Sequence, residues 1–336
     1  MNNSETNALR KPYSRIYVED AAKENPRTAR ILAKFPDAVV IPIRDYKHVF
    51  NRPHQPTQLQ KEAPALILAV QKPPFLYTGP AVCQDFGETY FYYTSGVMNC
   101  PFLCDYCYLR GMYPSGDIVL FVNLEDTFRE AETVLSEHPL YLCISYDTDL
   151  LALEGITGFF ADWTAFAAAH PDLTIEVRTK SSPAGLLETV PALPNVIYAI
   201  TLSPENVIAR FEHRTASLER RLQFAKAVIK SGCPLRLCFD PMLDVPDFEA
   251  VYGTFFNRVF SEIPGDAVRD ISVGTFRIAA DYLKRMRKNH PCEITTYPYT
   301  LTDGVYGYDP KRLDRMLRFA KEKLCSYTDE KKLFFG

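Results

Sequence analysis

Long apolar segments are missing from this sequence of 336 residues. A membrane-spanning helix needs a run of about 18 or more apolar residues, and no such run is present. The first residues, 1–7, are polar and do not form the apolar part of a signal segment. We therefore expect a cytoplasmic protein with no membrane partner. The formal net charge of −3 gives no general attraction to nucleic acid, although a local basic face would be hidden in that average.

Paired metal-binding motifs and repeats are also missing. The sequence has no second Cys-x-x-Cys pair and no His-x-x-x-His pair, so it offers no ordinary four-ligand zinc motif. It has no internal repeat and no low-complexity segment. Six of its nine cysteines show no metal-site spacing: Cys83, Cys143, Cys233, Cys238, Cys292 and Cys325. Because nothing marks the chain as secreted, we expect most of these to be buried, reduced thiols.

The other three cysteines lie on one short loop: Cys100, Cys104 and Cys107, with the spacing C-x3-C-x2-C. Three thiolates so placed can hold three irons of a four-iron cluster and leave the fourth iron open. An open iron can bind S-adenosylmethionine (SAM), and one electron then yields a 5′-deoxyadenosyl radical. The spacing resembles the cluster loop of the radical SAM superfamily, where an aromatic residue such as Tyr106 lies beside the adenine. Packing thiols, a zinc knuckle and disulfides explain the clustering less well.

Before this loop the sequence predicts a helix and two strands. Pro26–Phe35 suits a helix, because Asn25 can cap its start and proline is favoured at the first helical position. The aliphatic runs Ala38–Ile43 and Ala65–Val70 suit buried strands. Pro42 places the first of these strands at a sheet edge or a bulge.

After the loop, strands and helices alternate. We expect helices over 124–136, 158–170, 185–190, 217–230, 248–263 and 279–288, each after a strand, and a last helix over 311–324. The strands are expected at 118–122, 140–145, 173–178, 196–202, 235–241 and 271–276. Alternation of this kind implies βαβ units and a parallel sheet, whose carboxyl edge carries the chemistry. A strand over 90–94 would feed the cysteine loop at that edge.

The predicted fold class is α/β. Its centre is a partial (β/α)6 TIM-like barrel of the radical SAM type, since about six units are too few for a closed eightfold barrel. We expect a small N-terminal mixed α/β unit over residues 13–82, packed on the barrel. The barrel itself is expected over 83–290, and a C-terminal hairpin and helix over 291–336.

Five short motifs extend the pattern beyond the cysteines: Cys-Asp-Tyr-Cys-Tyr-Leu at 104–109, Tyr-Asp-Thr-Asp at 146–149, Arg-Thr-Lys at 178–180, Phe-Glu-His-Arg-Thr at 211–215 and Tyr-Gly at 306–307. With these motifs the chain resembles the spore photoproduct lyase family of radical SAM DNA-repair enzymes, from about Arg15 to Tyr308. The resemblance implies reversal of 5-thyminyl-5,6-dihydrothymine to two thymines through a 5′-deoxyadenosyl radical. It implies a 4Fe–4S cluster and SAM as cofactors. Its implied partners are ultraviolet-damaged DNA and an electron donor such as flavodoxin or ferredoxin.

The resemblance also implies roles for single residues. The loop cysteines match the cluster ligands and Tyr106 the residue beside the adenine. Lys180 matches a lysine that neutralises the SAM carboxylate, with Thr201 near the same group. Thr148 and Asp149 match a pair at the SAM amino end, although Asp149 could equally cap a following helix.

Two tyrosines match residues on the path of the radical. Tyr108 matches a tyrosine between the radical site and the hydrogen donor, and a core tyrosine is its alternative. Tyr306 resembles the lesion-facing tyrosine, on a hairpin expected around Asp303-Gly304. An ordinary hairpin aromatic is equally consistent with Tyr306.

Two positions depart from the best-known members of the family. Tyr146 stands where those members have a cysteine as hydrogen donor, and Val305 stands where they have an arginine. Cys143 lies three positions before Tyr146, so a strand would put the two on opposite faces and leave Cys143 in the core. We hypothesise that Cys83 donates the hydrogen and that Tyr108 and Tyr146 relay it. A packing role for Cys83 is the open alternative.

A DNA substrate requires a cationic surface, because a lesion must be turned out of the duplex and its phosphates held. Two basic stretches are candidates, and solvated helix faces are the alternative: Arg277, Lys284, Arg285, Arg287, Lys288 and His290, and Arg214, Arg220, Arg221, Lys226 and Lys230. Two other functions stay open. One is a radical SAM enzyme for another nucleotide, a peptide or a small molecule. The other is a non-catalytic iron–sulfur protein, which the set of SAM ligands argues against.

Overall fold

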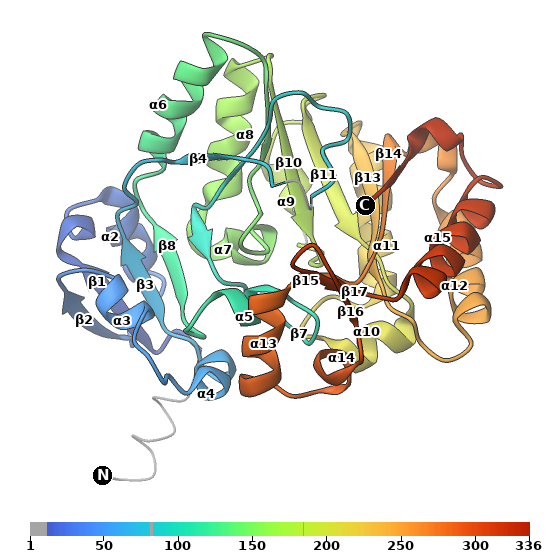
Figure 1. Cartoon of the computed structure of the whole chain (residues 1–336). Coiled ribbons are helices and arrows are strands. Elements are labelled where there is room, and N and C mark those ends of the chain that lie inside the picture. Colours follow the sequence, from blue (N-terminus) through green and yellow to red (C-terminus); the bar gives the residue numbers. More distant parts are fainter. Residues whose placement is uncertain (1–11, 81–82, 184) are drawn as a thin grey trace.

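The largest sheet has eight strands in the order β18-β14-β13-β11-β10-β9-β5-β4 (Figure 1). The structure, a computed structural model, describes residues 12–80, 83–183 and 185–336. All neighbouring strands of this sheet are parallel except β4 and β5. The strands are β4 (Leu76–Thr78), β5 (Phe91–Thr94), β9 (Leu140–Cys143), β10 (Leu173–Thr179), β11 (Val196–Thr201), β13 (Leu235–Met242), β14 (Asp270–Thr275) and β18 (Leu333–Phe335).

Helices pack against this sheet as expected for βαβ units. Contacts join α6 to β9, α8 to β10, α11 to β11 and β13, and α15 to β14. The end strands β4 and β18 do not pair with each other within the described ranges, so the barrel is open and the predicted partial barrel is confirmed. These helices and their neighbours are α6 (Leu124–Leu135), α7 (Glu154–Thr157), α8 (Phe159–Ala169), α9 (Leu186–Thr189), α10 (Glu205–Phe211), α11 (Leu218–Ser231), α12 (Phe248–Glu262) and α15 (Pro310–Leu324).

Local sequence explains these elements. Every residue of β9 and β11 is buried, as in parallel strands covered on both faces. Helix α11 begins where the Ser217 side chain accepts a hydrogen bond from the backbone N–H of Arg220, and it ends at Gly232, whose φ of 81° suits glycine. Asn25 caps α2 as predicted, by accepting a hydrogen bond from the N–H of Arg27.

A second sheet has five strands in the order β2-β1-β3-β8-β6. The expectation for the strand at 118–122 was wrong in one respect: it pairs with β3 of the N-terminal part instead of joining the barrel series. Its four residues are all buried and aliphatic or aromatic, so the pattern did not specify a partner. Pro42 lies on the edge strand β2, as predicted. The strands are β1 (Arg15–Glu19), β2 (Val39–Ile43), β3 (Leu66–Ala69), β6 (Val97–Met98) and β8 (Ile118–Phe121), and the helices beside them are α2 (Pro26–Leu32), α3 (Lys47–Phe50) and α4 (Thr57–Glu62).

Two small sheets complete the fold. In one, β7 (Leu103–Cys104) pairs antiparallel with β12 (Glu212–His213). In the other, β15 (Arg277–Ala279), β17 (Val305–Gly307) and β16 (Thr300–Thr302) are antiparallel. The predicted hairpin is confirmed, since Asp303 and Gly304 have φ of 48° and 80° between β16 and β17. The remaining helices are α5 (Leu109–Met112), α13 (Ala280–Asn289) and α14 (Glu293–Thr296).

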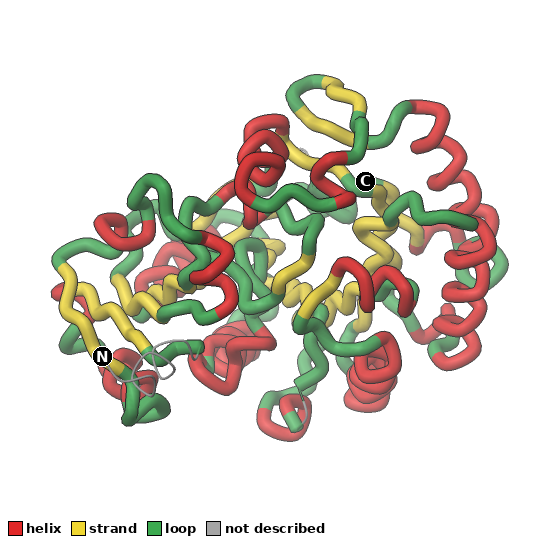
Figure 2. The backbone as a smooth tube through the Cα atoms, turned by 90° about the horizontal axis from the view of Figure 1, so that it is seen from below, coloured by secondary structure: helices red, strands yellow, loops and turns green. Residues whose placement is uncertain are grey.

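Strand pairing crosses both expected domain boundaries. The sheet of the N-terminal part includes β8 and β6, which lie after residue 83, and the eight-stranded sheet includes β18, near the end of the chain. One main hydrophobic cluster contains Ile16 and Leu66 together with Ile200 and Val273. Figure 2 shows the two sheets side by side, from below the view of Figure 1. Across the described residues, no helix is both long and apolar enough to cross a membrane.

Candidate active site

The cysteine loop leaves the carboxyl end of β5, the first parallel strand of the barrel. Asn99, just before Cys100, is fully buried and has a φ of 76°, which asparagine tolerates better than most residues. Its side chain accepts from Lys61 Nζ at 2.8 Å and donates to the carbonyls of Ser115 and Asp117 at 2.8 and 2.9 Å. These bonds fix the start of the loop. The sequence did not point to Asn99 or Lys61. Lys61 looks like an ordinary helix lysine, and its contact with Asn99 forms only on folding.

The three loop thiols are free, and their environment suits a metal cluster. Cys104 is buried, and Cys100 and Cys107 are half-buried. Burial raises the pKa of Cys100 to about 12, and it raises the pKa of Cys104 well above the usual thiol value. Cys107 adds to the raised pKa of Cys100, and Cys100 and Cys107 add to that of Cys104, so the three thiols lie close together. Thiolates gathered in this place need cationic charge, which iron supplies.

The residues expected at SAM follow three adjacent parallel strands. Thr148 and Asp149 come after β9, Lys180 after β10, and Thr201 ends β11. Lys180 Nζ lies 5.4 Å from the centre of the Tyr106 ring. The Tyr106 hydroxyl donates to Glu212 Oε1 at 2.5 Å, so the ring is held beside Lys180. The structure thus brings this predicted set together at the carboxyl edge.

The carboxylate of Asp149 is already occupied by protein groups. It accepts from the N–H of Ala152 at 3.0 Å, the N–H of Lys180 at 2.6 Å and the hydroxyl of Thr179 at 2.8 Å. The bond to Ala152 joins Asp149 to the first turn of the following short helix, Leu151–Leu153, although the N-cap position of that helix is Leu150. The hydroxyl oxygen of Thr148, in contrast, is buried without a hydrogen-bond partner among the described residues. The hydroxyl of Thr148 thus has hydrogen-bonding capacity that no described protein group uses, and Asp149 holds the backbone of Lys180.

Cys83 meets Tyr146 rather than Tyr108. Its Sγ lies 3.6 Å from the Tyr146 hydroxyl oxygen. The Tyr108 hydroxyl donates to the backbone carbonyl of Tyr146 at 2.7 Å, and the two rings are 6.1 Å apart. Tyr93 stacks on Tyr146 at 4.1 Å between ring centres. Cys143 is 8% exposed and belongs to the core, as expected.

Tyr306 lies on β17, away from this group. Arg287 of α13 lies over its ring, with the guanidinium carbon 5.2 Å from the ring centre. Arg287 also donates to the carbonyls of Thr295 and Tyr297. In the part of the chain that the structure describes, no ring contact or hydrogen bond joins Tyr306 to Cys83, Tyr108 or Tyr146. Arg287 thus brings an arginine to Tyr306 from α13. The neighbouring chain position, Val305, lacks the arginine of the best-known members.

Several members of the two basic stretches are not available to phosphates. Arg221 is fully buried and forms an ion pair with Glu212, so its expected place on a DNA surface is wrong. Arg277 is paired with Asp240, and His290 with Asp105. A carboxylate removed from water needs a cationic partner. The spacing of residues in the sequence did not show that these basic side chains take that role.

An open parallel barrel with three free thiols near a lysine at its carboxyl edge is the arrangement typical of radical SAM enzymes. The sequence model of the spore photoproduct lyase family matches residues 11–302. The chain belongs to this family.

Individual relatives are distant in sequence and close in fold. The chain is 23% identical to spore photoproduct lyase of Bacillus subtilis over 288 residues, 82% of each chain. It is 23% identical to that of a Geobacillus species over 173 residues, 50% of this chain and about half of the relative, 51%. A solved spore photoproduct lyase with dinucleoside spore photoproduct has a TM-score of 0.80 at 17% identity, covering 98% of this chain and 100% of that one. A variant with bound AdoMet and the same dinucleoside has a TM-score of 0.77 at 17% identity, covering 97% and 98%.

Proposed function

We propose that this protein is a radical SAM lyase that reverses the spore photoproduct to two thymines. Membership of the spore photoproduct lyase family supports the reaction, and solved relatives carry AdoMet and the dinucleoside lesion. The observation that carries the proposal is the gathering of Cys100, Cys104 and Cys107 with Lys180 close to Cys104. This set suits a cluster and SAM together.

In this proposal each residue of the site has one task. When bound, the 4Fe–4S cluster and SAM supply the 5′-deoxyadenosyl radical. The three loop cysteines hold the cluster, and the Lys180 ammonium neutralises the SAM carboxylate, with the Thr201 hydroxyl nearby. Thr148 offers its buried hydroxyl to the amino end. Tyr106 lies beside the adenine, held by Glu212.

Return of a hydrogen atom is assigned to Cys83. Its S–H bond breaks as a C–H bond forms on the thymine radical, and a sulfur radical remains. That radical takes a hydrogen atom from the Tyr146 hydroxyl 3.6 Å away, which restores the thiol. Tyr108, whose hydroxyl is bonded to the backbone carbonyl of Tyr146, would give its hydrogen atom to the Tyr146 oxygen radical and regain one from 5′-deoxyadenosine, so that no radical remains on the protein. Tyr306 faces the lesion from β17.

The test is anaerobic reconstitution followed by product analysis with SAM and the dinucleotide lesion. Formation of two thymines without net release of 5′-deoxyadenosine supports the proposal. Release of 5′-deoxyadenosine without thymine would instead assign another substrate. Absence of SAM cleavage would leave a non-catalytic iron–sulfur protein.

One observation favours a second candidate, a radical SAM enzyme with another nucleotide, a peptide or a small molecule as substrate. Tyr146 and Val305 both differ from the residues expected in the best-known members. For the lyase itself we propose lesion-bearing DNA as the natural substrate and a flavodoxin or ferredoxin as electron donor. We place its action in the cytoplasm.

A further inference from the structure

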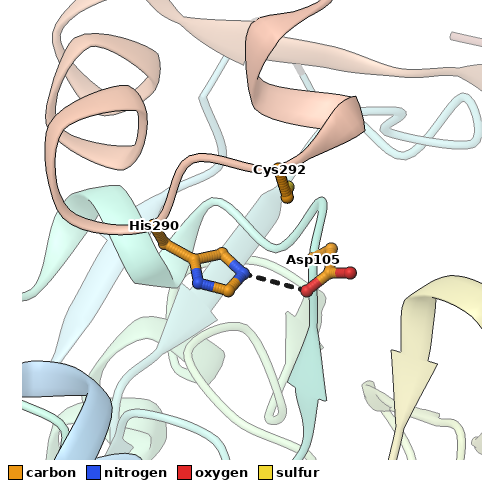
Figure 3. Close-up of side chains that lie close together, drawn as sticks. All are labelled: Asp105, His290 and Cys292. Atoms are coloured by element: carbon orange, nitrogen blue, oxygen red, sulfur yellow. Dashed lines mark hydrogen bonds and ion pairs between the residues drawn. The ribbon is translucent and has the colours of Figure 1, made fainter.

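A second group of metal-binding side chains lies beside the cluster loop. Asp105, His290 and Cys292 each offer one ligand atom, and these atoms all lie within 4.8 Å of one another. Figure 3 shows the three side chains converging from two separate segments. Asp105 stands between Cys104 and Tyr106, whereas His290 and Cys292 connect α13 to α14.

The contacts within this group are specific. His290 Nε2 lies 2.9 Å from Asp105 Oδ1, and His213 Nε2 lies 3.2 Å from Asp105 Oδ2. The thiol of Cys292 accepts from the backbone N–H and the hydroxyl of Thr295. The Asp105 side chain is only 12% exposed and that of His290 23%. Carboxylate, imidazole and thiol are thus held together in a half-buried place.

We propose that Asp105, His290 and Cys292 bind a structural Zn²⁺ ion, whose fourth position is filled by water or by His213, which lies at the other oxygen of Asp105. Oxygen, nitrogen and sulfur donors of these types are the ligands that zinc takes in proteins. Around a tetrahedral zinc ion with bonds of about 2.1 Å the ligand atoms stand about 3.4 Å apart, so small side-chain rotations suffice for Asp105, His290 and Cys292. A carboxylate, a thiolate and two neutral ligands around Zn²⁺ sum to zero charge, which suits half-buried surroundings.

The positive charge of Arg110 does not prevent a zinc ion from binding at this site. Arg110 lies 3.7 Å from Asp105, but its guanidinium donates to the carbonyls of Leu103 and Cys104 at 2.5 and 2.9 Å. Its charge is therefore shared with the backbone of the loop. A neutral zinc site next to Arg110 carries little repulsion.

A nucleophilic Cys–His–Asp triad fits the same residues less well. In a triad the imidazole uses its two nitrogens, one for each partner. Here Asp105 takes Nε2, and Figure 3 shows Cys292 on the side of that same nitrogen, with Nδ1 facing away. Convergence on one point is the geometry of metal ligands.

The site would tie the cluster loop to the segment that leads into the Tyr306 hairpin. Asp105 is part of the cluster loop, and Cys292 lies just before α14 and β16. The ligands are 185 residues apart in the chain, which is why the spacing of the cysteines gave no sign of zinc. This role holds whatever the substrate is.

The test measures zinc on the full chain with its iron–sulfur cluster assembled. We expect one tightly bound Zn²⁺ per chain in addition to iron, and a thiolate-to-metal absorption band when Co²⁺ replaces zinc. In Cys292→Ser and in His290→Gln, zinc affinity should fall at least about 100-fold, because a ligand is lost. The exposed Cys325→Ser variant is the matched control and should bind zinc as the parent does.

Three results would overturn the site. One is equal zinc binding by Cys292→Ser and the parent chain, and another is the absence of zinc from both. The third is zinc that disappears in Cys104→Ser but stays in Cys292→Ser, which would assign the ion to the cluster cysteines. Circular dichroism of each variant checks folding, and added zinc should raise the melting temperature of the parent but not of Cys292→Ser.

Discussion

Cys83 and Tyr146 form the single thiol–phenol contact of the proposed hydrogen path. Replacing Cys83 by alanine removes the S–H bond and leaves the cluster loop intact. We expect SAM cleavage to continue while thymine yield falls about tenfold, equivalent to about 1.4 kcal/mol, and diverted adducts to accumulate. Product analysis by liquid chromatography and mass spectrometry measures both. Cys325→Ala is the control, and a normal thymine yield without adducts in Cys83→Ala would contradict the assignment.

Lys180 has its ammonium group near the ring of Tyr106 and the buried thiol of Cys104. Lys180→Met keeps the length of the side chain and removes the charge that would meet the SAM carboxylate. We expect SAM to bind about 10- to 100-fold more weakly, since a charged hydrogen bond contributes about 1.5–3 kcal/mol. Anaerobic equilibrium binding checks this, with the exposed Lys230→Met as control. Unchanged affinity would mean that Lys180 does not contact SAM.

At this scale the sequence predicted the residues that belong to a motif and missed those that act through space. The three cysteines and Tyr106 share one short loop, so their grouping was visible. Lys61 reaches Asn99 across 38 positions, and Glu212 reaches Tyr106 across 106. Side chains that meet only after folding leave no spacing signal in a single sequence.

Among the elements, the two-residue pair of β7 and β12 links the cluster loop to the barrel. Glu212 is paired with Cys104 in this ladder. Its carboxylate accepts from Tyr106, from Ser203 at 2.7 Å and from Arg221 at 2.6 Å. Glu212→Gln leaves Arg221 buried without its counter-charge, so we expect a loss of about 3–5 kcal/mol in the free energy of unfolding. Denaturant titration measures this loss. As a control, Glu205→Gln, which removes one partner of an exposed ion pair, should lower the free energy of unfolding by less than about 1 kcal/mol.

The same carboxylate gives the chain a defined acid sensitivity. Burial alone would raise the pKa of Glu212, but Arg221 and Lys180 hold it below the usual value. Stability from ionised Glu212 is therefore present above the unfolded-state pKa of about 4.3 and is lost as pH falls through the lower folded-state value. Glu212→Gln should lack this part of the acid transition. An identical pH dependence in both proteins would contradict the role of the pair.

The order of helices and strands was predictable because strand-like and helix-like runs alternate along the chain, and some helices carry their own caps. Ser217 and Asn25 cap the helices that they were expected to begin. The partner of β8 was not predictable, since Ile-Val-Leu-Phe is buried at every position and carries no polar pattern. Its pairing with β3 depends on the whole fold.

At the scale of the molecule, the two sheets share one hydrophobic cluster, and strands from both ends of the chain complete them. Residues that are far apart in sequence therefore hold the cluster loop from several sides. Lys61 reaches it from α4, Glu212 from β12 and His290 from the end of α13. A boundary drawn at residue 82 or 290 would cut through these contacts.

The surface that meets DNA should lie on α13, because this helix contacts β15 and β17, the strand that carries Tyr306. Lys284 and Lys288 are exposed there, whereas Arg221 and Arg277 of the basic stretches are committed to ion pairs. Each lost phosphate contact should lower the slope of log affinity against log salt by about 0.9. The double variant Lys284→Gln/Lys288→Gln should therefore bind a lesion-bearing duplex more weakly and less salt-dependently, as measured by fluorescence anisotropy at several salt concentrations. The control Lys323→Gln on α15 should not change the slope, and a flat salt response of the parent chain would argue against DNA as substrate.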